Sequence, residues 1–156
     1  MTLSPEPLLG REALGDAVER LWAAVDPRAA IDGWATVELD RAVEEVAAAH
    51  ADLGPPQIGP AGDARLLGAR CRLLRFGGDR AVLLLEPSTE GRLAAALARF
   101  GEGRVARYLL VDAGAPERAR RAGFALGSEG RGPFGPERLV IVGPRHGPFL
   151  VLAGFD

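Results

Sequence analysis

The residues that could do chemistry in this chain are few. It has two histidines, His50 and His146, one cysteine, Cys71, and no lysine, so all 19 basic residues are arginines. Without lysine there is no P-loop side chain to reach the outer phosphates of a nucleotide, and no amine for a Schiff base. Arginine is permanently charged and cannot act as a general base. The arginines therefore contribute little to acid–base chemistry.

Each candidate acid or base has an ordinary structural interpretation. His50 lies on the apolar stripe of a predicted helix, which is typical of a core histidine whose ring nitrogens have hydrogen-bond partners. His146 lies in a predicted turn and is expected to be exposed. Glu86 ends a predicted strand just before Pro87, and we interpret it as a strand-end or helix-capping group rather than a base. The sequence has no metal motif, catalytic triad or nucleotide loop.

Composition bounds the class of protein. With 156 residues, 47% of them hydrophobic and 26% charged, the chain predicts one ordinary globular domain. The formal charge of −2 argues against a nucleic-acid partner, and no apolar run is long enough for a membrane span. The N-terminus does not resemble a secretory signal, and a lone buried thiol fits a reducing compartment. We therefore expect a cytoplasmic protein.

The first predicted element is an amphipathic helix over residues 11–25, which Pro27 ends. Its apolar side chains recur at helical spacing and must dock on another surface: Leu14, Val18, Leu21, Trp22 and Val25.

Short strands and helices alternate along the rest of the chain. The predicted elements are a strand over 33–39, a helix over 41–53 that Asp40 can cap, an irregular edge strand within 54–63, a hairpin over 69–87, a helix over 89–100, a strand over 105–112, a helix over 115–124, an edge strand within 125–130 and a second hairpin over 138–155.

The two hairpins belong to a repeated unit. Residues 72–85 and 138–151 align at a shift of 66 residues, with Arg72 on Arg138 and Gly77 on Gly143. A strand and a helix precede each hairpin. The chain therefore uses a strand–helix–strand–strand–strand unit twice.

This repeat, and above all the stretch LLLEPSTEGRLAAALARFGEGRVARYLLVD, resembles the vicinal oxygen chelate superfamily. That superfamily includes glyoxalase I, methylmalonyl-CoA epimerase, extradiol dioxygenases and bleomycin-resistance proteins. The resemblance implies an α+β fold in which two tandem βαβββ units form a curled mixed sheet, the cup, after an N-terminal amphipathic helix. The implied parts are an extension over 1–30 and a glyoxalase-like domain over 31–156, made of unit one at about 31–87, a linker helix at 88–103 and unit two at about 104–156.

The resemblance also locates the superfamily's metal site. There, four strands each supply one ligand to a divalent ion, typically His, Glu or Gln, His and Glu. The corresponding stations in this chain fall on Asp32 or Gly33, then Leu83, Ala106 and Val151. Hydrocarbon side chains cannot bind a metal ion, so Asp32 alone keeps a possible ligand. We therefore expect no metal and no cofactor.

Strand alternation gives a first candidate ligand surface. One face of the first strand carries Asp32, Trp34, Thr36 and Glu38, and the other carries Gly33, Ala35 and Val37. We expect the apolar set to pack on the helices and the other set to face the cup as an aromatic platform with carboxylates. An exposed or dimer-facing strand surface is the alternative.

The strand over 105–112 has two possible orientations. The resemblance turns Ala106 and Tyr108 inward and places Arg107 towards the helices. The opposite orientation places Arg107 in the cup, where it could hold an anion or pair with Glu38. We favour Tyr108 inward. The predicted ligand-lining residues are Asp32, Trp34, Thr36, Glu38, Leu83, Ala106, Arg107 and Tyr108.

A retained double repeat with emptied metal stations predicts a protein that binds a small molecule or a partner in its cup without turnover, as bleomycin-resistance proteins do; we assign no catalytic residue. Two alternatives stay open. One is a metal-dependent lyase, isomerase or dioxygenase with an atypical site, and the other is a dimeric assembly domain. Open cups of this superfamily often close by pairing, so we expect a homodimer.

Overall fold

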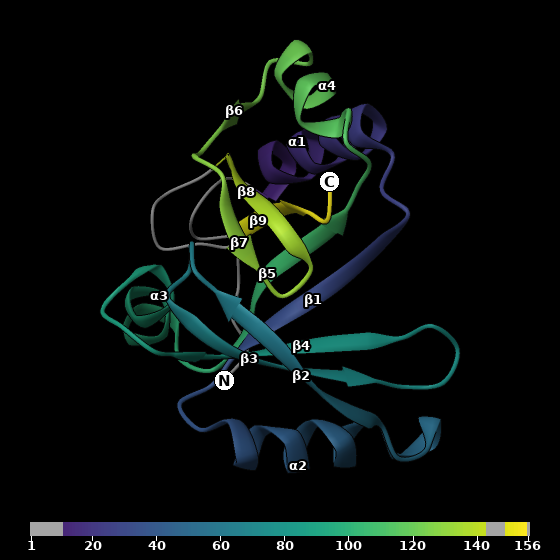
Figure 1. The fold of residues 1–156 in the computed structure, drawn as a ribbon, viewed down its shortest axis with the longest axis vertical. Coiled ribbons are helices and arrows are strands. Elements are labelled where there is room, and N and C mark those ends of the chain that lie inside the picture. Colours follow the sequence, from purple (N-terminus) through teal and green to yellow (C-terminus); the bar gives the residue numbers. More distant parts are fainter. Residues whose placement is uncertain (1–10, 143–148, 156) are drawn as a thin grey trace.

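Residues 11–142 and 149–155 are described by a computed structural model, in which four α-helices surround one mixed sheet (Figure 1). The elements are α1 (Arg11–Val25), β1 (Ala29–Ala35), α2 (Leu39–Ala49), β2 (Gln57–Ala64), β3 (Ala69–Arg75), β4 (Ala81–Pro87), α3 (Arg92–Phe100), β5 (Gly103–Leu110), α4 (Ala115–Arg121), β6 (Ala125–Leu126), β7 (Gly130–Gly132), β8 (Gly135–Ile141) and β9 (Phe149–Ala153). No helix in this part of the chain is both long and apolar enough to cross a membrane.

The sheet confirms the predicted repeat. Its strand order is β2-β3-β4-β1-β5-β9-β8-β6, with β7 also paired to β8. In each half the first strand runs parallel to the last, β1 beside β4 and β5 beside β9, and β1 and β5 join the halves as an antiparallel pair. The α+β fold class with two βαβββ units is therefore confirmed.

Most local predictions hold, because turn residues and periodicity fix them. β3 and β4 form the first predicted hairpin, and β8 and β9 form the second. The turn of the second hairpin, including His146, lies outside the described residues. The capping prediction was wrong: Glu38 is the N-cap of α2, and Asp40 lies within its first turn.

Apolar side chains from both halves fill the concave side of the sheet. They are Ile31 and Ala35 of β1, Leu83 and Leu85 of β4, Ala106 and Tyr108 of β5, Leu139 of β8, and Phe149, Val151 and Ala153 of β9. On the outside, α2 packs on the first half, and α1 and α4 pack together on the second half (Figure 1). The cup is therefore a filled core with α1, α2 and α4 on its convex face, whereas Leu93 and Ala96 of α3 belong to the core of the cup.

The N-terminal helix docks within its own chain. Leu21 and Val25 of α1 are fully buried against the second half of the sheet. The guanidinium of Arg118 in α4 donates to the carbonyls of Ala24 and Val25 at 2.9 and 3.0 Å, which satisfies the C-terminal end of α1. Arg118 therefore helps to hold α1 against α4.

The two arms of the cup touch at one end. The backbone N–H of Arg65, after β2, donates to the carbonyl of Arg131 in β7 at 3.2 Å. Gly130 and Gly132 lie at this junction, and Leu66 packs directly over Gly130. The sheet itself stays open, because β2 and β7 are not paired as strands.

Candidate functional site

The four residues that the resemblance assigns to metal stations lie on neighbouring strands of the sheet. Gly33 is in register with Leu83 on one side and Ala106 on the other, and Val151 pairs with the neighbouring Tyr108. These residues present only hydrogen or hydrocarbon to the cup, so they do not fit a divalent ion. Within the described residues, no group of three His, Cys, Asp or Glu side chains could hold a metal.

The predicted orientation of β1 was wrong. Ile31 and Ala35 belong to the core of the cup, whereas Trp34 packs in the cluster under α2. Gly33 also faces inward: a Cβ placed there would lie 3.0 Å from Leu85 and 3.1 Å from Ala106, so a side chain would require these neighbours to shift. The error arose because the cup is filled with apolar side chains, so the apolar face of the strand belongs inside.

Asp32 faces outward between two arginines. Its carboxylate lies 3.6 Å from Arg104 and 3.4 Å from Arg107. The guanidinium of Arg107 also lies over the ring of Trp22 in α1, 5.6 Å from its centre. Arg107 is therefore on the convex face, and Tyr108 is inward as we favoured.

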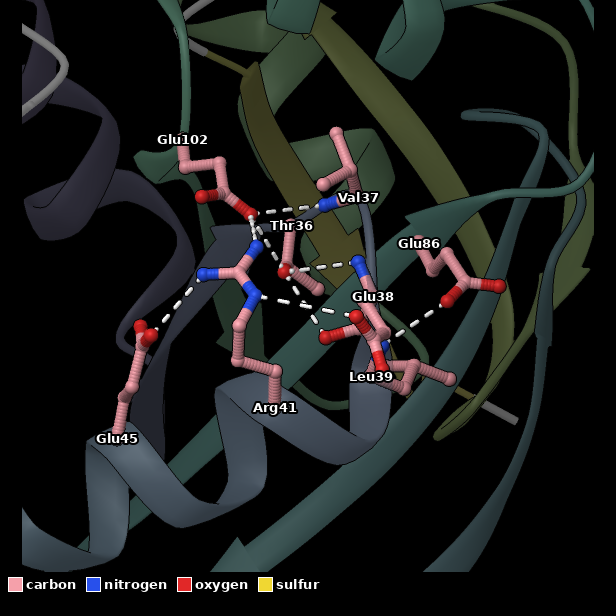
Figure 2. A network of polar contacts seen from close by, with 8 residues as sticks. All are labelled: Thr36, Val37, Glu38, Leu39, Arg41, Glu45, Glu86 and Glu102. Carbon is pink, nitrogen blue, oxygen red and sulfur yellow. Dashed lines mark hydrogen bonds and ion pairs between the residues drawn. The ribbon is translucent and has the colours of Figure 1, made fainter.

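Thr36 and Glu38 belong to a polar network at the start of α2, shown in Figure 2. The carboxylate of Glu102 accepts from Thr36 Oγ1 at 2.7 Å, from the Val37 N–H at 2.9 Å and from Arg41 at 2.7 Å. The Val37 N–H, with Arg41 and Thr36, lowers the pKa of Glu102 to about 2. The network fastens the turn before α2 to the start of β5.

Glu86 caps α2, which confirms that it serves as a capping group. Its carboxylate accepts from the Leu39 N–H at 2.9 Å, in the first turn of the helix, and pairs with Arg70 (Figure 2 shows the first contact). Arg70 lowers the pKa of Glu86, so this group stays ionised. His50 is satisfied as well: its Nδ1 lies 2.9 Å from the Val46 carbonyl, and its ring contacts Phe76.

A groove of about 680 Å³ opens at the mouth of the cup, where β1 and β4 begin. Ile31, Ala81, Leu110 and Phe134 give it an apolar floor, and Arg28, Arg75 and Arg80 lie around it. A second groove of about 470 Å³ shares Arg75 and Phe134 and follows β2. Arg75 and Arg80 are exposed and pair with no carboxylate among the described residues. An apolar groove with free guanidinium groups suits a ligand that joins an apolar part to an anion.

A buried carboxyl, Glu137, was missed by the sequence analysis. It lies on the inner face of β8, has no solvent exposure, and neither carboxyl oxygen has a hydrogen-bond partner among the described residues. Burial raises its pKa to about 7, partly offset by the nearby Leu66 backbone. A Cβ at Gly132 would overlap the carboxyl, so the missing side chain there leaves space for it.

The charge of Glu137 acts on two further polar groups of the cup. Tyr108 is fully buried and its hydroxyl has no described partner. Burial, together with the Glu137 charge, raises the pKa of Tyr108 well above its ordinary value. Burial raises the pKa of Cys71 to about 12, so both groups keep their protons at neutral pH. The cup therefore holds one carboxyl that can ionise near neutrality beside a hydroxyl that can only donate or accept a hydrogen bond.

The signal for Glu137 was present in the strand pattern. In the strand GPERLVIV, Glu137 lies two residues before Leu139, so both side chains point to the same face of the sheet. A carboxylate at an inward position is unusual enough to mark a candidate site.

Several solved structures are similar to this chain. The methylmalonyl-CoA epimerase of Mycobacterium tuberculosis matches with a TM-score of 0.66 and 23% identity, over 81% of this chain and 86% of that one. A variant of the Streptomyces coelicolor methylmalonyl-CoA epimerase, in complex with 2-nitronate-propionyl-CoA, matches with a TM-score of 0.63 and 22% identity, over 78% of this chain and 92% of that one. A hypothetical protein of Bacillus halodurans matches with a TM-score of 0.63 and 15% identity, over 79% and 90%. The sequence matches no protein-family model and no curated protein. The chain thus has the vicinal oxygen chelate fold, as the resemblance implied.

Proposed function

We propose that this protein binds an anionic acyl ester of the coenzyme A type in the groove at the mouth of its cup, and that it does so without the superfamily's metal ion. The groove carries the proposal: its floor is apolar, and it is bordered by Arg75 and Arg80, which form no ion pair among the described residues, and by one carboxylate, Asp79. Guanidinium groups bind phosphates in paired hydrogen bonds. The epimerase with the same fold that holds 2-nitronate-propionyl-CoA supports this ligand class.

The stations support the metal-free part of the proposal. Gly33, Leu83 and Ala106 adjoin one another in register and offer no lone pair. Ligand binding therefore rests on the apolar floor and the arginines. Of the residues predicted to line a ligand, Leu83, Ala106 and Tyr108 are buried in the core of the cup and do not line the groove. Asp32, Trp34, Thr36, Glu38 and Arg107 belong to the convex face or the α2 network.

Calorimetry with 2-nitronate-propionyl-CoA tests the proposal on protein purified without added metal. We expect saturable binding that weakens about tenfold in an Arg75→Gln/Arg80→Gln variant, which corresponds to about 1.4 kcal/mol for two exposed ion pairs. Arg121→Gln, an exposed arginine on α4, is the matched control and should bind like the wild type. Absence of binding, or equal loss in the control, would contradict the proposal.

We also propose that the protein is a homodimer in the cytoplasm. β2 is an edge strand, and its Ile58 is 51% exposed, which suits pairing with a second copy. Helix α1 does not support a dimer, because its apolar side already docks within its own chain. Light scattering at micromolar concentration tests this, and a monomeric mass would contradict it.

A further inference from the structure

The cup contains a polar centre that ligand binding at its mouth does not use. Glu137 on β8 and Tyr108 on β5 are both fully buried, and neither side chain has a hydrogen-bond partner among the described residues. Leaving such groups unpaired costs about 1–3 kcal/mol each. Gly132 leaves the space in which the carboxyl sits, so the position of Glu137 is built into the fold.

This centre lies next to the groove. Glu137 and Leu110 are both in register with Ala153, so they stand at the same level on either side of β9, and Leu110 lines the groove. Phe134 also lines the groove, and its ring lies edge-on to Tyr108 with 5.6 Å between centres. Tyr108 and Glu137 are fully buried and do not line the groove, so an acyl group would have to displace the ring of Phe134 to reach them.

We propose that Glu137 is the proton carrier of a metal-independent 1,3-proton shift in a β,γ-unsaturated acyl thioester, with Tyr108 donating a hydrogen bond to the thioester carbonyl. The inference rests on the proposed function, because the coenzyme A part of the substrate binds at the mouth. It assigns catalysis to side chains that lie on none of the four metal stations.

The reaction balances without a co-reactant. The carboxylate of Glu137 takes a proton from the carbon next to the carbonyl, and the electron pair of that C–H bond spreads onto the carbonyl oxygen as a dienolate. Tyr108 stabilises the oxygen by its hydrogen bond. Glu137 then returns the proton to the γ carbon, and the double bond moves into conjugation with the carbonyl.

The presence of only one buried carboxylate in the described part of the cup favours a proton shift between two carbons over inversion at a stereocentre. Apart from Glu137, the described carboxylates include none that is buried in the cup. Inversion at a stereocentre needs a second group that delivers a proton to the opposite face, whereas one base can carry a proton between two carbons on the same face. Cys71 and Tyr108 stay protonated near neutral pH, so neither can replace the base.

The ionisation of Glu137 suits this role. A general base works best when its pKa lies near the working pH, and burial places this pKa at about 7. The groups coupled to it electrostatically are the Tyr108 hydroxyl, the Cys71 thiol and the Leu66 backbone, with Asp63 acting on Cys71. No described arginine neutralises it.

The test uses 3-butenoyl-CoA and the full chain with a chelator present, and follows the ultraviolet absorbance of the conjugated product. We expect isomerisation that rises with pH to a plateau, with a midpoint near 7. Glu137→Gln should lower kcat at least about 100-fold, and Tyr108→Phe about 10- to 100-fold. Glu90→Gln removes an exposed carboxylate and should leave the rate unchanged.

Calorimetry on the same samples separates the two proposals. If 3-butenoyl-CoA binds the wild type but is not isomerised, or if Glu137→Gln isomerises it at the wild-type rate, the catalytic inference is overturned and the binding proposal stands. If the compound does not bind, both proposals are overturned. Melting temperatures report whether each variant folds, and Glu137→Asp, which keeps the carboxylate but shortens its reach, should keep part of the activity.

Discussion

Replacing Glu137 by glutamine should remove a pH dependence from the stability of this protein. Burial raises the pKa of the carboxyl from its ordinary 4.5 to about 7. In this range the folded protein holds a proton that the unfolded chain has released, so the folded state loses stability as the pH rises from 4.5 to 7. Glutamine fills nearly the same space and does not titrate.

The size of the effect follows from the two pKa values. Between about pH 5 and about pH 8, the shift from 4.5 to about 7 costs the wild type about 2.5 kcal/mol. The variant does not share this cost. The difference in unfolding free energy, variant minus wild type, should therefore grow by about this amount over the same pH range. Every other titrating group is common to both proteins and cancels in the difference.

Urea unfolding at several pH values measures this difference, provided that the m-values of the two proteins agree. Glu90→Gln, on an exposed glutamate, serves as the control and should differ from the wild type by a constant amount. If the curves of Glu137→Gln and the wild type stay parallel between about pH 5 and about pH 8, Glu137 does not titrate near neutrality, and its assignment as a base would be refuted.

Three further substitutions test the structural account by chemical denaturation. Gly132→Ala should destabilise the fold by about 1–3 kcal/mol, because the new methyl group overlaps the carboxyl of Glu137; adding Glu137→Ala should recover part of this loss, and additive losses would count against the overlap. Glu102→Gln should lower the free energy of unfolding by about 1 kcal/mol at neutral pH, allowing for the partial exposure of Glu102, and this loss should shrink as the pH falls from 4.5 towards 2. Glu45→Gln removes the other carboxylate that pairs with Arg41 and should lower the free energy of unfolding by less. Leu21→Ala should cost about 2–4 kcal/mol because the side chain is fully buried, and an unchanged stability would show that α1 does not dock.

The order of elements could be predicted from the sequence because local signals determine it. The turn GGDR between two apolar runs fixed the first hairpin, and the aligned second copy fixed the repeat. Alternation separates the two faces of β1 but does not say which face is inside. Asp32 and Trp34 were therefore placed in the cup, although Asp32 pairs with arginines outside and Trp34 packs under α2.

The polar centre of the cup required the tertiary structure. Glu137 and Tyr108 come from strands that are separated by β9 in the sheet, and the space for the carboxyl depends on Gly132 in a third strand. The capping of α2 by Glu86 is similar, since the two groups lie 47 residues apart. Such pairings follow from register and not from spacing along the chain.

Metal dependence tests the central claim most directly, namely that the cup binds its ligand without an ion at the four stations. Binding of 2-nitronate-propionyl-CoA should be measured on protein stripped with a chelator and on the same protein supplied with manganese or cobalt. We predict equal affinity and no stoichiometric metal in the supplied sample by elemental analysis. Tighter binding that needs one bound metal ion per chain would contradict the account.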